Sequence, residues 1–324
     1  MNIILASALL ELSTLSMQTA QSIKKVFIQK IIEHPALDQT TRGIIDGLEK
    51  NGYRQGINIE VCVESAQGNP SLALQIAAKF IGKEPDVVVG VATLAAQSFL
   101  KYVKEKKVNL VFSSITDPIE AKLVQKIDAP GNHTSGVSNF VSLTPQIQVF
   151  KKIYPGLKRL GFLYNPGEMN SLSLIKQLEA LCPKLGIRLV LQTANKTSEV
   201  SQAATKLASQ VDAIFISNDS TALSALKTII NVATKVKIPV YVSDTDAVHL
   251  GALAALGPNQ YKIGLQTAQI IVRCLKGEDL STIPVEFPKN TELYLNEAAA
   301  ERIGIILPES LKAQAAKIIP RGGS

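Results

Sequence analysis

The sequence reads FSSITDPIEAKLVQKIDAPGNHTSGVS over residues 112–138, a run that places polar loop residues between two apolar segments. The apolar residues 108–112 predict a strand. Three hydroxyl side chains follow it: Ser113, Ser114 and Thr116. Asp117 before Pro118 then predicts a helix start, because Asp accepts hydrogen bonds from free N–H groups and Pro loses none at the first helical position. In an open α/β sheet, hydroxyls and a helix start after a strand indicate the binding crevice.

The same alternation of apolar runs and amphipathic segments occurs on both sides of this run. Before it, strands are expected at residues 26–32, 59–63, 86–91 and 109–112, with helices at 41–50, 71–82 and 93–102. The short segment after Asp117 carries Ile119, Leu123 and Val124 on one helical face. After it, helices are expected at 143–153, 171–185, 199–207 and 221–236, with strands at 159–164, 187–192, 212–217 and 240–242. This order predicts an α/β protein with two Rossmann-like, doubly wound lobes.

The last part of the chain departs from this order and predicts crossings between the lobes. A strand is expected at 251–256, a long helix at 261–277 and an extended run at 285–295. Since each half lacks one element, we expect lobe 1 to comprise residues 23–141 and 250–285, and lobe 2 residues 142–249 and 286–324. The crossings would lie near residues 138–143, 243–250 and 284–288. Three crossings between two lobes make a hinge.

Composition excludes several classes of protein. The 324 residues are 46% hydrophobic and 19% charged, so the chain can bury the cores of two domains. The net charge of +7 is spread without a long basic run, and we expect no nucleic-acid partner. The three cysteines are far apart in apolar segments, which favours buried thiols over disulfides or a metal site. They are Cys62, Cys182 and Cys274.

Seven short runs together resemble one known family. They are EHPALD, AQG, ATLAAQ, TDPIEAKLV, PGNHTSGVS, LYNPGEMNS and GALAALGPNQYKIG, and they span most of residues 26–308. In this order they resemble the substrate-binding proteins of ABC importers of the tryptophan/tyrosine-binding type. The resemblance implies a type I periplasmic-binding fold, with two lobes and three crossovers. It also implies capture of an amino acid, often an aromatic one, and its delivery to a membrane permease.

The first 22 residues have two interpretations. An apolar stretch at residues 3–10 precedes small and polar residues, but no Lys or Arg forms the basic start of a secretory signal, and Glu11 interrupts the pattern. The segment is a degraded export signal, which the resemblance favours, or else it reflects a misassigned start or an internal helix. No other apolar stretch approaches the roughly 18 residues of a membrane span. We expect a periplasmic or extracellular protein, membrane-associated through its permease.

An amino-acid ligand requires a particular set of groups. Its carboxylate needs N–H or hydroxyl donors, its ammonium needs a carboxylate, and its side chain needs an apolar wall. The predicted loops supply these types. In the first lobe the candidates are His34, Thr93, Ser113, Ser114 and Thr116, and in the second lobe Glu168, Asn170, Ser171, Asn218, Asp219 and Asp244.

Several of these candidates have a structural alternative as helix caps. Asp117, Ser171 and Ser220 each stand where a cap is expected. If Ser220 caps its helix, the Asp219 carboxylate is free to face the ligand's ammonium, and we expect this role for it. Asp246 is a further loop acid beside Asp244. The family usually shows Thr-Asp-Asn where this chain has Asn218-Asp219-Ser220. This difference leaves the identity of the ligand's side chain undecided.

The remaining residues predict no catalysis. His34 ends the first strand and is expected in the ligand wall, while His133 and His249 have no metal-ligand spacing to it. No catalytic triad or phosphate-binding glycine loop can be assembled. Aromatic candidates for the ligand wall, with a core role as the alternative, are Phe140, Tyr164 and Tyr261. We expect a monomeric binding protein without a cofactor.

Two other functions use the same lobes. A ligand-sensing regulator of the LacI type would need a DNA-binding helical module, and no more than 25 residues precede the first expected strand. An α/β enzyme would need an acid/base pair or a cofactor signature in the crevice. Neither is visible, so the binding protein is the preferred hypothesis.

Overall fold

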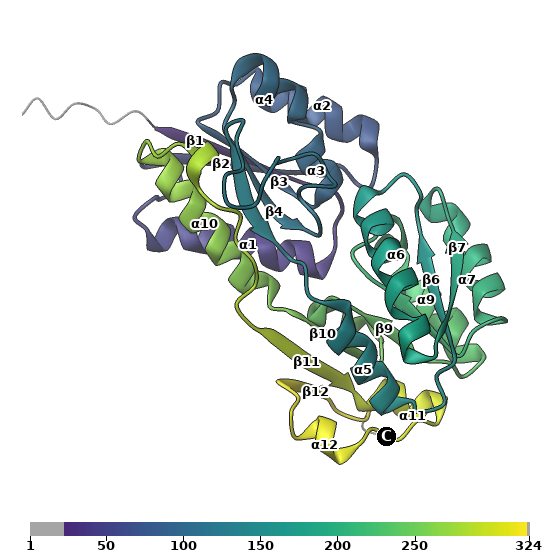
Figure 1. The fold of residues 1–324 in the computed structure, drawn as a ribbon. Helices are drawn as coiled ribbons and strands as arrows, with labels where there is room; N and C mark the ends of the chain where they lie inside the picture. The colour runs from purple at the N-terminus through teal and green to yellow at the C-terminus, as the bar shows by residue number, and fades with distance from the viewer. Residues whose placement is uncertain (1–22, 323–324) are drawn as a thin grey trace, which may run out of the picture.

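Five parallel strands form the first sheet of the computed structural model, which describes residues 23–322 (Figure 1). Their order is β2-β1-β3-β4-β5. The strands are β1 (Lys24–Lys30), β2 (Ile59–Ser65), β3 (Val87–Val91), β4 (Leu110–Ile115) and β5 (Thr134–Ser138). The helices of this lobe are α1 (Pro35–Lys50), α2 (Pro70–Ile81), α3 (Thr93–Gln97), α4 (Leu100–Lys106) and α10 (Gln260–Leu275). The Val-rich β3 is buried along its whole length, as expected for a strand covered on both faces.

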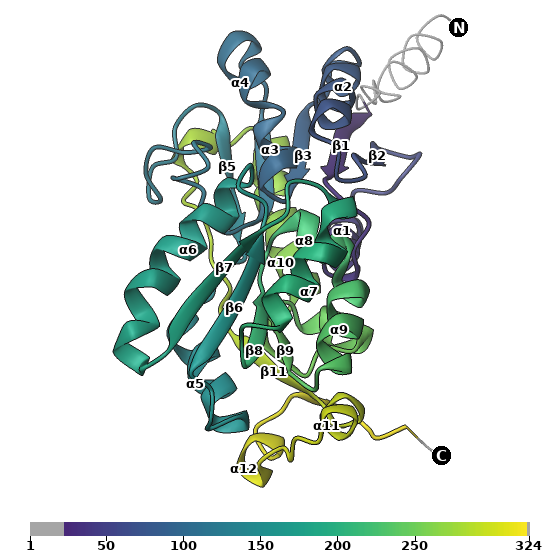
Figure 2. The ribbon, with the colours of Figure 1, turned by 90° about the vertical axis from the view of Figure 1, so that its right-hand side faces the viewer.

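Seven strands form the second sheet, in the order β12-β11-β10-β9-β8-β6-β7. They are β6 (Arg159–Tyr164), β7 (Arg188–Thr193), β8 (Ala213–Ile216), β9 (Val240–Val242), β10 (Ala254–Pro258), β11 (Thr291–Asn296) and β12 (Lys317–Ile319). The helices are α5 (Leu143–Ile153), α6 (Met169–Leu181), α7 (Val200–Ala208), α8 (Ser220–Ser224), α9 (Leu226–Lys235), α11 (Glu297–Ile303) and α12 (Glu309–Lys312). Only β10 and β11 pair antiparallel among the described ladders. Figure 2 shows α11 and α12 at the end of this lobe. The expected two doubly wound lobes are confirmed.

The chain crosses between the lobes three times, and one crossing differs from the prediction. The first follows β5, as expected, and the third follows Glu286, which still pairs beside Val137 of β5. The second was expected near residues 243–250, but β10 belongs to the second sheet. The connection from β9 to β10 is short and contains one 3-10 helix, η4 (Thr245–Leu250). It returns the chain beside β9 in the same sheet. The crossing therefore lies between β10 and α10, and residues 250–258 do not complete lobe 1.

The segment after Asp117 is a turn, not the expected helix. Lys122 has a left-handed backbone with φ of 59°, which ends the structure after one turn. Leu123 and Val124 are buried, but Ile119, which was expected on the same face, is 46% exposed. The helices expected at 93–102 and 221–236 are each broken in two, as α3 and α4 and as α8 and α9.

Two glycines allow α1 and α10 to pack closely. A Cβ atom on Gly264 would lie 2.1 Å from the carbonyl oxygen of Thr40, and one on Gly43 would lie 2.2 Å from that of Tyr261. Any larger residue would push the helices apart, because a backbone atom cannot yield as a flexible side chain does. Figure 1 shows α10 beside α1, and this contact brings the start of α10 to the end of β4.

Within residues 23–322 no helix is long and apolar enough to cross a membrane. The same residues hold no cluster of His, Cys, Asp and Glu that could bind a metal ion. All three cysteines are free; two are buried and Cys62 is half-buried. The possible export signal at residues 1–22 lies outside the described residues.

Candidate functional site

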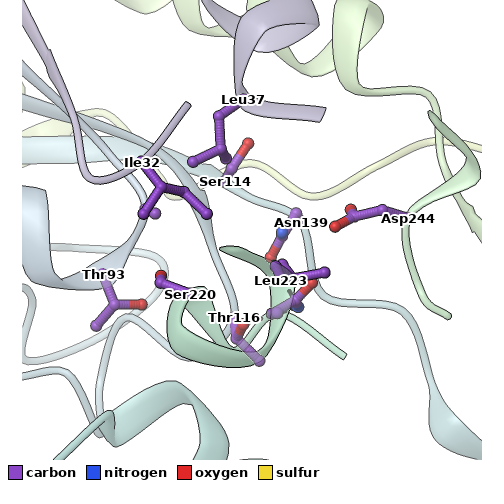
Figure 3. Close-up of a pocket in the computed structure, with 11 residues that line it drawn as sticks. Ile32, Leu37, Thr93, Ser114, Thr116, Asn139, Ser220, Leu223 and Asp244 are labelled. Carbon is purple, nitrogen blue, oxygen red and sulfur yellow. Dashed lines mark hydrogen bonds between the residues drawn. The ribbon is translucent and has the colours of Figure 1, made fainter. Parts of the chain in front are cut away.

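A small cavity of about 20 Å³ lies where the two sheets face each other (Figure 3). Its walls come from segments that follow β1, β3, β4 and β5 in the first lobe, and β8 and β9 in the second. This is the carboxyl edge of the parallel strands in both sheets, where open α/β folds place their ligands. The lining residues are Ile32, Leu37, Ala92, Thr93, Ser114, Thr116, Asn139, Asn218, Ser220, Leu223 and Asp244.

The lining combines neutral polar groups, one carboxylate and an aliphatic wall. The polar groups are hydroxyls and amides, and no Lys or Arg of residues 23–322 lines this cavity. Asp244 supplies the carboxylate, and in Figure 3 it points toward the other labelled side chains. Four aliphatic residues complete the wall: Ile32, Leu37, Ala92 and Leu223. Such a lining can accept hydrogen bonds from an ammonium and contact an apolar side chain.

The end of β4 has an irregular backbone that separates its two serines. Ser114 has φ of 56°, and the pairing with β5 shifts register between Ser113 and Ile115. A left-handed, non-glycine residue at a bulge is typical of functional sites. Ser114 consequently lines the cavity, whereas Ser113 bonds to the hydroxyl of Thr267 at 2.6 Å, inside the first lobe. Of the two predicted serines, only Ser114 reaches the cavity.

Polar contacts between side chains join the two lobes at the cavity and farther out. Asn218 Nδ2 donates to Thr116 Oγ1 at 2.9 Å. Farther out, Ser173 Oγ donates to Asp117 Oδ2 at 2.8 Å, and Lys176 pairs with Glu120 at 3.3 Å. Asp117 Oδ1 also accepts from the N–H groups of residues 119 and 120, so its predicted capping role is confirmed, although it caps a turn.

The prediction that Ser220 caps its helix and leaves Asp219 free is wrong. Asp219 is the N-cap of α8, and its Oδ1 accepts from the N–H of Ala222 at 2.8 Å. Its Oδ2 accepts from the N–H of Asn165 at 2.7 Å and from Ser171 Oγ at 2.6 Å. Asp219 is fully buried and does not line the cavity. Ser220 lies at the first helical position and lines the cavity instead.

Glu168 and Asn170 belong to the same hydrogen-bonded cluster. Glu168 accepts from the N–H groups of Ser220 and Thr221 at 2.8 and 2.9 Å, and so satisfies the first N–H groups of α8. Asn170 donates to the backbone oxygen of Asn218 at 2.6 Å. Burial and the nearby Glu168 carboxylate raise the pKa of Asp219 to about 7. Glu168, Asn170, Ser171 and Asp219 therefore hold the loop that carries Asn218 and Ser220.

Asp244 is the carboxylate that remains available. It is 4% exposed, and its Oδ1 accepts one hydrogen bond, from Gln260 Nε2 at 2.8 Å. Its Oδ2 makes no hydrogen bond to any part of the chain that the structure describes. Burial raises the pKa of Asp244 to about 6, against the hydrogen bond from Gln260, which favours the charged form. The neighbouring Asp246 is only half-buried and lines a separate surface hollow.

His34 and the aromatic candidates lie outside the cavity lining. His34 caps α1, where its Nδ1 accepts from the N–H of Ala36 at 3.3 Å, and burial lowers its pKa to about 4. It is therefore a neutral cap. Phe140 and Tyr164 pack against the second core, and Tyr261 donates to Asp46 at 3.0 Å. The alternative core role holds for Phe140 and Tyr164.

Sequence reasoning found five of the lining residues and missed the others. The five are Thr93, Ser114, Thr116, Asn218 and Asp244. Asn139 directly follows β5, a position that indicates the crevice as strongly as that of Thr93 after β3. The aliphatic wall carries no such signal, because Ile, Leu and Ala are the residues of any core.

The comparisons with known proteins agree with this architecture. The model of the family "ABC transporter substrate binding protein" matches residues 25–319. A tyrosine-binding protein of Clostridioides difficile is 31% identical over 274 residues, which are 85% of this chain and 79% of that protein. A solved ABC domain from Streptococcus pneumonia in complex with L-Trp is 30% identical, with a TM-score of 0.88 over 92% of this chain and all of that one.

A third relative differs more in shape. The ligand-free, open structure of a substrate binding protein with adhesive properties from Clostridium difficile is also 30% identical, but its TM-score is 0.69 over 93% of this chain and all of that one. The two lobes and three crossings described above are the type I periplasmic-binding fold. Members of the matched family bind solutes and are not enzymes, and they are extracellular or periplasmic. The chain belongs to the ABC transporter substrate-binding proteins.

Proposed function

We propose that this protein captures an amino acid, with an aromatic one favoured, in the cavity between its lobes and delivers it to the permease of an ABC importer. The observation that carries the proposal is the Asp244 carboxylate, which has a free oxygen in a cavity otherwise lined by neutral polar and aliphatic side chains. An ammonium group would pair with that oxygen. The hydroxyls and amides of Thr93, Thr116 and Asn139 offer donors for the ligand's carboxylate.

The choice of an aromatic amino acid rests on the relatives. One is a tyrosine-binding protein and another was solved with L-Trp. An aliphatic wall suits a flat ring as well as an aliphatic side chain, because burial of apolar area stabilises either. No aromatic residue in the described part of the chain lines the cavity, so recognition of the ring would not depend on stacking with those residues.

Entry of such a ligand requires the lobes to separate. The cavity of about 20 Å³ has room for about one water molecule. An aromatic amino acid is many times larger, so it enters from a more open form and the lobes then close around it. The comparisons support this motion: at equal identity, the chain matches the L-Trp complex more closely than the open, ligand-free structure. The three crossings supply the hinge.

The proposal includes the protein's place in the cell. We infer an exported, monomeric protein that works outside the cytoplasmic membrane and is held there by its permease. The possible signal at residues 1–22 would direct export.

Titration calorimetry with L-tyrosine and L-tryptophan tests the ligand class, and L-leucine and L-glutamate serve as controls. We expect binding of an aromatic amino acid with recovery of the unchanged ligand. Solution scattering should show a smaller radius of gyration at saturating ligand. Native mass spectrometry of protein purified without refolding would identify a retained ligand. Failure of every amino acid to bind would refute the proposed ligand class.

A further inference from the structure

Gln260 occupies the point at which the chain passes from the second sheet to the first. It is the first residue of α10, and Asn259 caps the helix by accepting from the N–H of Lys262 at 3.0 Å. The preceding strand, β10, lies in the second sheet, whereas α10 packs on α1 in the first lobe. Gln260 is 1% exposed. Its side chain is therefore enclosed where the lobes join, although it does not line the cavity.

The Gln260 amide bonds to both lobes. Its Nε2 donates to Asp244 Oδ1 at 2.8 Å, in the second lobe. Its Oε1 accepts from Thr40 Oγ1 and Ser114 Oγ, each at 3.0 Å, in the first lobe. The opposite orientation of the amide would place its carbonyl oxygen against a buried carboxylate, where two acceptors repel. The charge of Asp244 thus fixes which way the amide points.

This orientation decides what Ser114 can offer a ligand. A serine hydroxyl has one proton, and the proton of Ser114 has acceptors inside the protein, in Gln260 Oε1 and Thr40 Oγ1. The hydroxyl then turns a lone pair toward the cavity. On the other side, the single bond from Gln260 leaves Asp244 Oδ2 without a partner among the described residues. Two acceptors, one from each lobe, consequently face the same space.

We propose that Gln260 is a positioning residue that links Asp244 and Ser114 across the lobes, so that both accept hydrogen bonds from the ligand's ammonium. The inference rests on the proposed function, because it names the part of the cavity that receives the ammonium. Gln260 itself does not touch the ligand. It acts by holding the carboxylate and the hydroxyl at fixed positions, which lowers the cost of ordering them on binding.

The charges around Asp244 lie on several packed elements. Asp246 is on the same 3-10 helix, with Glu292 of β11 and Lys317 of β12 beside it. From α1, Arg42 shares the surface hollow that Asp246 lines and pairs with Asp46 at 3.6 Å. None of these groups lines the cavity, so the hydrogen bond from Gln260 is the nearest influence on the charge of Asp244.

The test replaces Gln260 by Met, which has a similar length and no hydrogen-bonding amide. The matched control is Gln266→Met on the same helix, because Gln266 donates to Glu286 at the third crossing and lies away from the cavity. The first measurement is the titration of the Asp244 carboxyl by carbon NMR in the ligand-free protein, assigned with Asp244→Asn. Gln260→Met should move this titration to higher pH, because the charged form loses its donor. Gln266→Met should leave it unchanged.

The second measurement is calorimetry with L-tryptophan and L-tyrosine between pH 5 and 9. Gln260→Met should weaken binding by roughly 10-fold or more at pH 7.5, the effect typical of a lost bond to a charged group. Gln260→Glu is a second variant if the Met variant does not fold. Its carboxylate would face Asp244 and should move the Asp244 titration further upward.

Two results have distinct meanings. If the parent protein bound no aromatic amino acid, the ligand class would be refuted, and the NMR titration would still decide the role of Gln260. If the Asp244 titration stayed in place in the Gln260 variants, the positioning role would be overturned, even if their melting temperature fell.

Discussion

Replacing Asp244 by Asn should weaken ligand binding and at the same time stabilise the ligand-free protein. Asn keeps the size of the side chain, and its Oδ1 can still accept from Gln260 Nε2. The substitution removes the charge that would pair with the ligand's ammonium. Loss of one partner of a desolvated charge pair costs about 2 to 5 kcal/mol, so the dissociation constant should rise by roughly 30-fold or more.

The stabilising effect follows from the raised pKa of Asp244. The pKa is about 6 in the folded protein against an ordinary value of 3.8, so the folded state holds its proton to higher pH than the unfolded state does. The contribution of this group to stability therefore falls as the pH rises from about 4 to about 6. Above pH 6 the buried charge costs at most about 3 kcal/mol, at 1.36 kcal/mol per pKa unit. Asp244→Asn removes this cost, and the melting temperature of the ligand-free protein at pH 7.5 should rise.

Ligand binding should also depend on pH in a defined direction. Because the ligand pairs with the charged carboxylate, affinity should fall about tenfold for each pH unit below 6. This acid limb should be absent in Asp244→Asn. Calorimetry between pH 4.5 and 8, with L-tryptophan as the probe, measures both the affinity and the limb.

Asp246→Asn is the control for this experiment. Asp246 lies two residues away, and its pKa is also raised to about 6, yet it does not line the cavity. Its replacement should leave the dissociation constant within about threefold of the parent, since it contacts no ligand group. Equal affinity of Asp244→Asn and the parent protein would refute the assignment of the ammonium to Asp244.

Three further substitutions test the parts that hold the cavity. Asp219→Asn should lower the free energy of unfolding by about 1 to 3 kcal/mol, because its new NH₂ group would face the N–H of Asn165. Urea unfolding measures this change, and an unchanged midpoint would contradict the capping role. Thr116→Val removes the oxygen that accepts the hydrogen bond from Asn218, and should raise the ratio of open to closed ligand-free protein by roughly 2- to 10-fold. An unaltered solution-scattering profile would argue against closure through this hydrogen bond. Gly264→Ala should destabilise the protein by about 2 kcal/mol or more, since its Cβ would lie 2.1 Å from the Thr40 carbonyl oxygen. A melting temperature equal to that of the parent protein would be inconsistent with the close α1–α10 contact.

The sequence was sufficient to predict the two lobes because each lobe repeats one local pattern, a strand followed by a helix. Apolar runs such as β3 and amphipathic segments such as α1 alternate, and parallel strands joined by helices leave few possible topologies. The misplaced crossing shows where the rule fails. The strand β10 follows β9 after a 3-10 helix of six residues, and sequence periodicity does not reveal to which sheet a strand returns. That choice depends on the antiparallel pairing of β10 with the distant β11, in which Ala254 lies opposite Leu295 and Pro258 lies opposite Thr291.

Two other features of the site could not be predicted from the sequence because they depend on backbone conformation. Ser113 and Ser114 are neighbours of the same type, but Ser113 bonds to Thr267 inside the first lobe, whereas Ser114, which has a left-handed backbone, lines the cavity. The expected helix after Asp117 has the right cap and the right apolar spacing, but Lys122 turns left-handed and ends it. Neither residue is a glycine, the usual sign of such a conformation in a sequence.

The two carboxylates that follow β8 and β9 show why residue type and position do not identify a ligand group. Both Asp219 and Asp244 are buried and precede a short helix, but Asp219 accepts three hydrogen bonds and Asp244 accepts one. A carboxylate that already accepts several hydrogen bonds gains little from a ligand, whereas an oxygen that faces the cavity without a donor gains a partner. The missing hydrogen-bond donor that makes the charged Asp244 costly in the ligand-free protein is thus also the reason why it should bind an ammonium. The same reasoning ties stability and binding to the titration of Asp244: above pH 6 its contribution to the stability of the ligand-free protein is lowest, and the ligand should add most to the stability there.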